Sequence, residues 1–359
     1  MRPRRIAFGT VAALGLVVGS TAMIGCCAFS APGYQGPRSD HFDGTHFHNE
    51  VVQKPHRTGD LIRWITHRHP GPWPEHPDAK PGPPPPRRVD GGRLHVTFVN
   101  HATVLVQMDG LNVLTDPIWS ERASPVSFAG PKRVRPPGIR FDDLPPIDVV
   151  LISHDHYDHL DLPTLERLWK RDHPKILLGL GNDLLLAKHG IDSHALDWWQ
   201  SVRVSDSVEV TAVPAQHFSG RGLCDRRKTL WEGFVISGPS GNVYFAGDTG
   251  FGPHFEEIHE RFAPIRLALL PIGAFRPEWF MARVHLSPAD AIIAHYELGA
   301  GTSVGIHFGT FRLADDGEDE APGDIRRAVA ASAKEGVPLR FWILGFGEGR
   351  DVPPVPGGS

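Results

Sequence analysis

The six residues from His154 to His159, HDHYDH, constrain this chain more than any other feature of its sequence. They follow Ser153, which ends Val149–Ile152, a continuous apolar run of the kind that forms a strand buried on both faces. Apolar residues then recur at helical spacing from Leu162 to Trp169, with Asp161 at the expected N-cap. The HDHYDH run is therefore predicted to form a loop between a buried strand and a helix.

Imidazole nitrogen and carboxylate oxygen are good ligands for zinc and similar divalent metals. Alternate residues of an extended loop point to the same side, so His154 and His156 can hold one ion. Asp158 and His159 can then reach a neighbouring position. A single His-x-His would more simply be a solvated polar loop, but four ligand-type residues in six positions favour a metal site.

Three further ligand-type residues each follow a segment with a strand signal: His217, Asp248 and His307. Any one of them alone would more simply be a structural histidine or a turn aspartate. Together with the loop they predict a centre in which two ions, about 4 Å apart, activate water and stabilise an anionic transition state. The predicted ligands are His154, His156 and His217 for one ion, Asp158, His159 and His307 for the other, and Asp248 as the bridge. Zinc is the expected metal, and iron or manganese can occupy such sites.

Strand and helix signals alternate along the rest of the chain, with a hairpin turn at Asp109-Gly110. Strands are predicted at residues 94–99, 103–108, 111–114, 207–213, 233–237, 242–246, 267–272, 303–306 and 339–344. Helices are predicted at residues 254–261, 288–297 and 324–335, the middle one opened by a capping box at Ser287. Mixed elements in this order indicate sheets packed together and covered by helices.

The first 26 residues have the pattern of an export signal, with arginines followed by the uncharged apolar run 6–24. The run ends at Cys26 in a sequence that resembles a bacterial lipoprotein cleavage box, and a plain signal peptide or an uncleaved anchor are the alternatives. We therefore expect an exported protein, held at a membrane or free outside the cytoplasm. Cys224 is expected to be an incidental thiol.

Residues 27–88 are rich in Gly, Pro and His and end in a polyproline stretch, which is typical of a semi-rigid spacer. We interpret them as an arm that partly wraps a catalytic domain at residues 89–350, and residues 351–359 as a flexible tail. The net charge of −4, without a basic stripe, argues against nucleic acid as a partner.

The spacing HxHxDH, followed by His217, Gly247-Asp248-Thr249 and His307, resembles the metallo-β-lactamase superfamily. That resemblance implies an α/β fold, an αββα sandwich with two mixed sheets covered by helices and the metals at one edge. A narrower set of matches resembles the phospholipases D that hydrolyse N-acylphosphatidylethanolamine. These matches include segments 100–104, 114–118, 130–133, 144–148, 245–250, 271–274, 279–281 and 306–311.

The narrower resemblance implies hydrolysis of a membrane phospholipid to phosphatidic acid and an N-acylethanolamine, by a hydroxide that bridges the two ions. Asp158, Asp248 and His285 are the expected catalytic residues, with His285 at the mouth of the site or, alternatively, a polar residue at a helix start. Asp116 and His101 are expected behind the metal ligands, since a metal-bound imidazole usually donates to a carboxylate or carbonyl. For Asp116, a turn before Pro117 is the alternative.

An aromatic-rich loop is a candidate lipid-binding surface, although such clusters are more often core. Its candidate residues are Phe275, Trp279 and Met281. Two other functions stay open from the sequence. One is another hydrolase of the same fold, such as a lactonase or a phosphoester hydrolase. The other is a non-catalytic lipid-binding lipoprotein, against which the intact ligand set argues.

Overall fold

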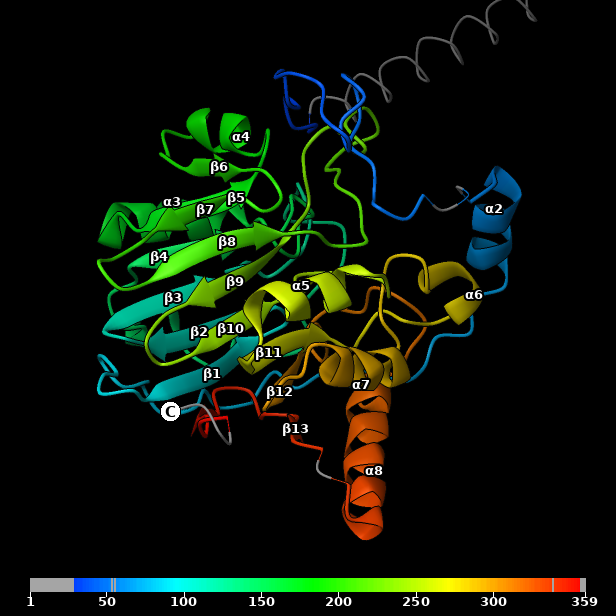
Figure 1. The fold of residues 1–359 in the computed structure, drawn as a ribbon. Coiled ribbons are helices and arrows are strands. Elements are labelled where there is room, and N and C mark those ends of the chain that lie inside the picture. The colour runs from blue at the N-terminus through cyan, green and yellow to red at the C-terminus, as the bar shows by residue number, and fades with distance from the viewer. Residues whose placement is uncertain (1–28, 53, 55, 338, 356–359) are drawn as a thin grey trace, which may run out of the picture.

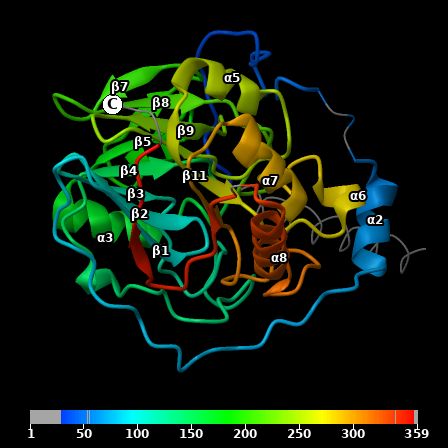
Figure 2. The ribbon, with the colours of Figure 1, turned by 60° about the horizontal axis from the view of Figure 1, so that its bottom comes forward.

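The computed structural model describes residues 29–52, 54, 56–337 and 339–355 of the 359-residue chain. Two seven-stranded sheets pack face to face, and helices cover their outer faces (Figure 1 and Figure 2). This arrangement confirms the predicted αββα sandwich. Within these residues, no helix is both long enough and apolar enough to cross a bilayer.

The first sheet has the strand order β14-β1-β2-β3-β4-β5-β6. Its strands are β1 (Leu94–Asn100), β2 (Thr103–Met108), β3 (Leu111–Thr115), β4 (Val149–Ile152), β5 (Lys175–Gly179), β6 (His194–Leu196) and β14 (Gly349–Asp351). The β14, β1, β2 and β3 neighbours pair antiparallel, whereas β3 to β6 pair in parallel. Asp109 and Gly110, both at positive φ, make the predicted tight turn between β2 and β3.

The second sheet has the order β13-β12-β11-β10-β9-β8-β7. Its strands are β7 (Ser201–Arg203), β8 (Glu209–Val213), β9 (Gly233–Ser237), β10 (Asn242–Phe245), β11 (Ile265–Pro271), β12 (Ser303–Ile306) and β13 (Phe341–Trp342). The β7 to β10 neighbours pair antiparallel, and β10 to β13 pair in parallel. Parallel pairing brings the carboxyl ends of β10, β11 and β12 to one edge of the sheet.

Side chains alternate between two cores along the strands of the first sheet, as the period of two requires. In β4, Val149 and Leu151 pack in the central core between the sheets, whereas Val150 and Ile152 face the outer core. Both faces of β4 are therefore buried, which explains why its sequence is a continuous apolar run.

The helices are α2 (Thr58–Thr66), α3 (Leu162–Asp172), α4 (Asp183–Ala187), α5 (His254–Phe262), α6 (Glu278–Met281), α7 (Pro288–Glu297) and α8 (Glu320–Glu335), with a 3-10 turn at Phe141–Asp143. α3 and α4 pack on the outer core of the first sheet, and α5, α7 and α8 lie against the second. The predicted capping box of α7 is present, with Ser287 and Asp290 each accepting from the other's backbone N–H. Asp161 occupies the N-cap position of α3, but its carboxylate accepts from the Ser120 and Thr164 hydroxyls instead of capping the helix.

The segment before β1 wraps the sandwich. Phe42 and Phe47 are buried against Trp198, Leu230 and Trp231 in a small cluster of their own. After α2 the chain runs along the outside of the molecule to β1 (Figure 2). The arm thus begins by packing into the body and only then extends over the surface.

Three expectations concern the ends of the chain and its cysteines. The export signal and Cys26 lie outside the described residues. Cys224 is disulfide-bonded, which corrects the expectation of an incidental thiol. The tail predicted from residue 351 is also corrected at its start, because Asp351 belongs to β14 and Val352 is buried.

Candidate metal centre

Loops from both sheets meet at one edge of the sandwich. The HDHYDH loop follows β4 directly, and Asp116 follows β3, its parallel neighbour. From the second sheet, His217 comes after β8, Asp248 after β10 and His307 directly after β12. The fold therefore brings together residues that are far apart in the sequence.

One group of histidines contains the three predicted ligands of the first ion. The Nε2 atom of His154 lies 2.8 Å from His156 Nδ1, and His217 Nε2 lies 3.3 Å from the same His156 atom. These three side chains offer ligand atoms that all lie within 4.8 Å of one another. That spacing suits a single ion held between them.

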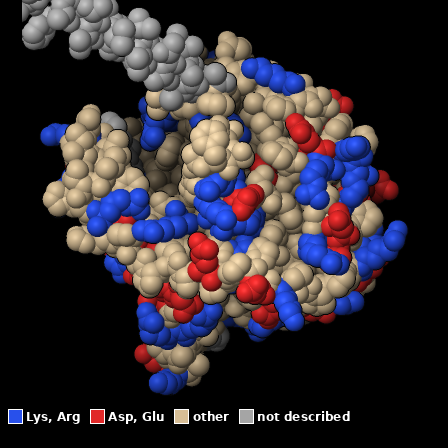
Figure 3. All heavy atoms as spheres, turned by 180° about the vertical axis from the view of Figure 1, so that it is seen from behind, with Lys and Arg blue, Asp and Glu red and all other residues tan. Residues whose placement is uncertain are grey.

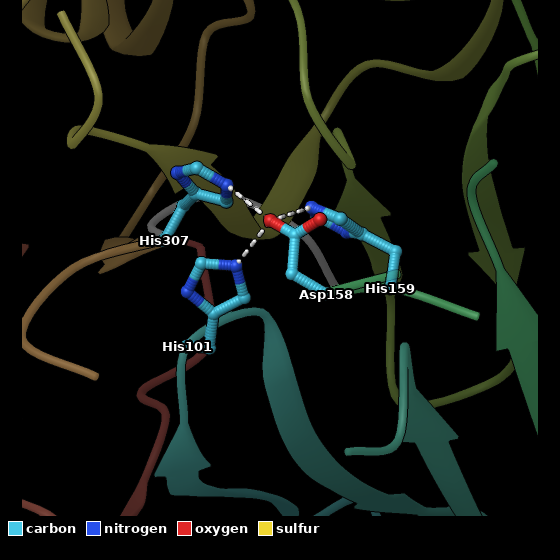
Figure 4. Close-up of side chains that lie close together, drawn as sticks. All are labelled: His101, Asp158, His159 and His307. Carbon is cyan, nitrogen blue, oxygen red and sulfur yellow. Dashed lines mark hydrogen bonds and ion pairs between the residues drawn. The ribbon is translucent and has the colours of Figure 1, made fainter. Parts of the chain in front are cut away.

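A second group surrounds the carboxylate of Asp158 (Figure 4). Its Oδ2 atom lies 2.9 Å from His101 Nε2, 3.3 Å from His159 Nε2 and 3.4 Å from His307 Nε2. The three rings point toward this oxygen from different loops. His101 was expected behind the ligands, but the structure places its ring directly against Asp158.

Asp248 lies between the two groups. Its Oδ2 atom is 3.1 Å from His307 Nε2 and 3.3 Å from His159 Nε2 in the second group. The same oxygen is 4.0 Å from His217 Nε2 and 3.8 Å from His285 Nδ1. A single carboxylate can therefore reach both groups, which is the position predicted for a bridge.

Several buried ligand-type atoms of this cluster have no hydrogen-bond partner, namely His159 Nε2, His307 Nε2, Asp248 Oδ1 and His285 Nδ1. Buried polar atoms are normally paired, because leaving one unpaired costs about 1–3 kcal/mol. Unpaired nitrogen and oxygen atoms that lie close together are the ligands that a bound divalent ion needs.

The protonation of the histidines depends on their distance from carboxylates. Burial holds the pKa of His154 and His217 well below its usual value, so these imidazoles are neutral, the form that binds a metal. Burial also lowers the pKa of His156 to about 4. For His307 burial acts in the same direction, but Asp248 and Asp158 outweigh it and raise the pKa to about 9. The Asp158 and Asp248 carboxylates thus concentrate negative charge where cations would bind.

Outer partners fix the orientation of the histidine rings. Asp116 is fully buried, and its Oδ2 accepts from His159 Nδ1–H at 2.6 Å and from the Ser153 hydroxyl at 2.6 Å. His217 Nδ1–H donates to Val284 O at 2.8 Å. Both bonds leave Nε2 of the ring free to face the cluster. Asp116 has the position expected from the sequence, although the turn interpretation also holds in part, since its φ is +32°.

Two residues that anchor the HDHYDH loop, Asp155 and Arg221, carry no such signal in the sequence. Asp155 points away from the cluster, and its carboxylate accepts from Gly220 N–H and the Thr229 hydroxyl. Arg221 donates to the backbone oxygens of Asp155 and Leu160. They lock the loop in place through hydrogen bonds that only the folded chain makes.

The cluster forms the floor of a pocket of about 270 Å³. His156, Asp158, Asp248, His285 and His307 line it. Two apolar residues, Met281 and Leu313, are also among the lining residues. His285 and Met281, both predicted near the site, border this pocket.

The structure does not bring the other two predicted lipid contacts to this pocket. Phe275 is 2% exposed and packs in the central core, so it has no free surface for a substrate. Trp279 is 44% exposed, but it lies outside the pocket lining, with the Arg63 guanidinium 4.7 Å from the centroid of its ring.

Comparison with known proteins agrees with this geometry. The Beta-lactamase superfamily domain matches residues 111–308. An uncharacterized protein of Mycobacterium tuberculosis is 41% identical over 264 residues, which cover 72% of this chain and 69% of the relative. The N-acyl-phosphatidylethanolamine-hydrolyzing phospholipase D 1 of Caenorhabditis elegans is 41% identical over 232 residues, 61% of this chain and 65% of the relative.

Solved structures show the same fold. Igni18, a metallo hydrolase from Ignicoccus hospitalis, superposes with a TM-score of 0.55 at 22% identity, covering 73% of this chain and 99% of that protein. A possible metal-dependent hydrolase from Veillonella parvula gives a TM-score of 0.56 at 15% identity, with 72% and 99% covered. Together with the clustered ligands, these matches show that the chain is a metal-dependent hydrolase of the metallo-β-lactamase superfamily, close to the phospholipases D that hydrolyse N-acylphosphatidylethanolamine.

Proposed function

We propose that the protein is a zinc-dependent phosphodiesterase of the phospholipase D type. Its proposed substrates are N-acylphosphatidylethanolamine-like membrane phospholipids, and its products are phosphatidic acid and an N-acylethanolamine. One observation carries the proposal: Asp248 lies between two histidine groups beside a pocket, in a chain that is 41% identical over 232 residues to the Caenorhabditis elegans phospholipase D.

A pair of bound divalent ions would lower the pKa of a water molecule and neutralise the oxygens of a phosphodiester. His154, His156 and His217 would hold one ion, and Asp158, His159 and His307 the other, with Asp248 shared. The two aspartates orient the reacting groups by fixing these positions. His101, against Asp158, supports the second group through its 2.9 Å contact.

Two further features of the pocket support direct hydrolysis of a phosphodiester. Among its described lining residues there is no serine or cysteine, so neither of these two nucleophiles borders the pocket. His285 lines the pocket with its Nδ1 unpaired and 3.8 Å from Asp248 Oδ2. That nitrogen is placed to form a hydrogen bond with a phosphoryl or leaving oxygen.

An apolar surface next to the pocket supports a membrane phospholipid as substrate. α2 docks on α6 through Trp64, which stacks on Phe280 at 4.9 Å between ring centroids. Its other apolar side chains stay open to solvent, with Ile62 56% and Ile65 60% exposed. Trp64 also packs against the cluster that contains Met281 of the pocket, which joins this exposed face to the site. An exposed apolar face of this kind is suited to a lipid surface.

The N-terminal apolar run and Cys26 support the proposed location outside the cytoplasm. An exported protein tethered through Cys26, or free outside the cytoplasm, would meet its substrate at a membrane surface.

On the face seen in Figure 3, acidic and basic residues are interspersed, and no continuous basic stripe of the kind suited to nucleic acid is visible.

The proposal is tested with purified full-length protein loaded with zinc and mixed micelles of N-acylphosphatidylethanolamine. We expect release of phosphatidic acid and N-acylethanolamine, with loss of both when His156 is replaced by alanine. Turnover of a lactone with no lipid product would refute the proposed substrate and favour another hydrolase of the fold. Wild-type protein that binds no metal would favour the lipid-binding, non-catalytic alternative.

A further inference from the structure

The arm before β1 reaches the candidate metal centre through the side chain of Asn49. Its Nδ2 donates to the backbone oxygen of His217 at 2.9 Å, and its Oδ1 accepts from the backbone N–H of His217 at 3.1 Å. The amide thus pairs with both backbone groups of one residue, in the way that a neighbouring strand would. The two residues are 168 positions apart in the sequence.

These two bonds matter because His217 lies outside the regular strands. β8 ends at Val213, and the next contact with a neighbouring segment is an isolated bridge between Gln216 and Gly250. Among the described residues, the backbone N–H and C=O of His217 have no hydrogen-bond partner other than Asn49. Without Asn49, both backbone groups of His217 would lose their partner, and the peptide would be held by the bond from Gly250 N–H to Gln216 O and by the contacts of the ring.

Asn49 is itself held firmly. Its Oδ1 also accepts from Trp231 Nε1–H at 2.8 Å. Just before it, Phe47 is fully buried, and just after it the backbone oxygen of Val51 accepts from the Gln216 side chain at 3.0 Å. The arm therefore offers His217 a preorganised partner instead of a mobile one.

The orientation of the His217 ring completes the arrangement. Its Nδ1–H donates to Val284 O, which turns Nε2 toward His156 and Asp248. One bond sets the rotation of the ring, and the two bonds from Asn49 set the position of the backbone to which the ring is attached. Ligand atoms need to be placed to within about 0.5 Å for a productive site.

We propose that Asn49 is a positioning residue for the metal ligand His217, so that the N-terminal arm is a working part of the metal centre and not only a spacer. The inference rests on the proposed metal site and is independent of the proposed lipid substrate. It predicts that the arm governs how tightly the ion held by His154, His156 and His217 is retained.

The test compares Asn49→Ala with a matched variant, Asn112→Ala, in the full-length zinc-loaded protein. Asn112 is a buried asparagine that, like Asn49, ties the arm to the body. Its side-chain amide donates to Arg87 O in the arm and to Pro146 O in the body. It lies at the start of β3, at the opposite end from the metal loops. Loss of zinc to a chromophoric chelator is followed over time, together with the visible spectrum of the cobalt-substituted proteins.

We expect Asn49→Ala to release the zinc ion of the His154, His156 and His217 group about tenfold faster than wild type. The cobalt spectrum should also change. Loss of a residue that positions a metal ligand commonly lowers metal affinity 10- to 100-fold. Asn112→Ala should lower thermal stability but leave release and spectrum unchanged. Equal release from the two variants would overturn the inference. Slow release by wild type together with absence of lipid turnover would refute only the proposed substrate.

A second variant, Asn49→Asp, covers the case in which the alanine variant does not fold. Aspartate keeps the size and the oxygen that accepts from His217 N–H and Trp231, but it places a second oxygen against the His217 carbonyl. Zinc release from folded Asn49→Asp that is faster than from wild type supports the inference. A release rate equal to that of wild type contradicts it.

Discussion

Replacement of Asp116 by asparagine should weaken metal binding while leaving the shape of the site intact. The Asp116 carboxylate is fully buried and accepts three hydrogen bonds, from Ser153 N–H to Oδ1 and from the Ser153 hydroxyl and His159 Nδ1–H to Oδ2. Asparagine can keep the bond to Oδ1. An amide NH₂ in place of Oδ2 would donate to His159 Nδ1, and the ring proton would then have to sit on Nε2. That nitrogen faces Asp158 and Asp248, so the protonated form cannot bind the ion.

The expected size of this effect follows from the lost bond. A hydrogen bond to a charged group contributes about 1.5–3 kcal/mol, and about 1.4 kcal/mol corresponds to a tenfold change in affinity. Asp116→Asn should therefore lower zinc affinity about 10- to 100-fold, which matches the range for outer partners of metal ligands. Lipid turnover at limiting zinc should fall by a similar factor and recover in part when zinc is added.

Asp109→Asn is the matched control. Asp109 also has a positive φ, and its carboxylate also accepts from a serine N–H and hydroxyl, those of Ser240, at the hairpin turn away from the metal loops. Zinc affinity is measured by competition with a chromophoric chelator and stability by thermal melting. Wild-type zinc affinity in Asp116→Asn would refute the tautomer argument, as would an equal loss in both variants.

Three further predictions follow from the structure. Asp248→Asn should lower turnover more than about 100-fold without unfolding the protein, because one shared ligand of both groups is lost; turnover within threefold of wild type would contradict the shared position. Replacing both Ile62 and Ile65 by glutamate should weaken binding to phospholipid vesicles about tenfold or more, since burying each isoleucine contributes about 1.5–3 kcal/mol; Leu184→Glu, on distant α4 (Figure 1), is the control, and equal binding by all three proteins would remove α2 from the lipid surface. Burial, with Asp197 nearby, raises the pKa of Glu232 well above its usual value, so the folded state retains a proton that the unfolded chain releases above about pH 4.3. The free energy of unfolding should then fall by up to about 1.4 kcal/mol per pH unit as the pH rises above about 4.3. Glu232→Gln should flatten this slope, and identical slopes in urea unfolding of the two proteins would contradict the shift.

Much of the sheet structure could be predicted because the strands carry the pattern of their burial. The predicted strands at Thr103–Met108, Val149–Ile152, Gly233–Ser237 and Ser303–Ile306 are observed with the same bounds. The strand predicted at residues 339–344 is only Phe341–Trp342, at the edge of its sheet, where one neighbour is missing. An apolar sequence pattern does not show how many residues of a segment pair with a neighbouring strand.

The predicted lipid contacts likewise show that local sequence does not reveal the surroundings of a residue in the fold. Phe275 and Met281 belong to one aromatic-rich segment, yet Phe275 is buried in the central core and Met281 lines the pocket. Composition gives the two residues equal standing as candidate contacts. Their different roles depend on the path of the chain after β11, which no local pattern encodes.

Residue type and spacing by themselves determined which residues form the candidate metal centre, because ligand chemistry allows few alternatives to histidine and aspartate in such a run. The HDHYDH loop, His217, Asp248 and His307 were all identifiable in this way. The sequence also predicted His101 and Asp116 near the ligands, but only the tertiary structure showed which ligand each contacts, with His101 against Asp158 and Asp116 behind His159, and it alone showed Asn49 behind His217. Those contacts join segments that are distant in the sequence, and a hydrogen bond has no sequence signature until folding brings donor and acceptor to within about 3 Å.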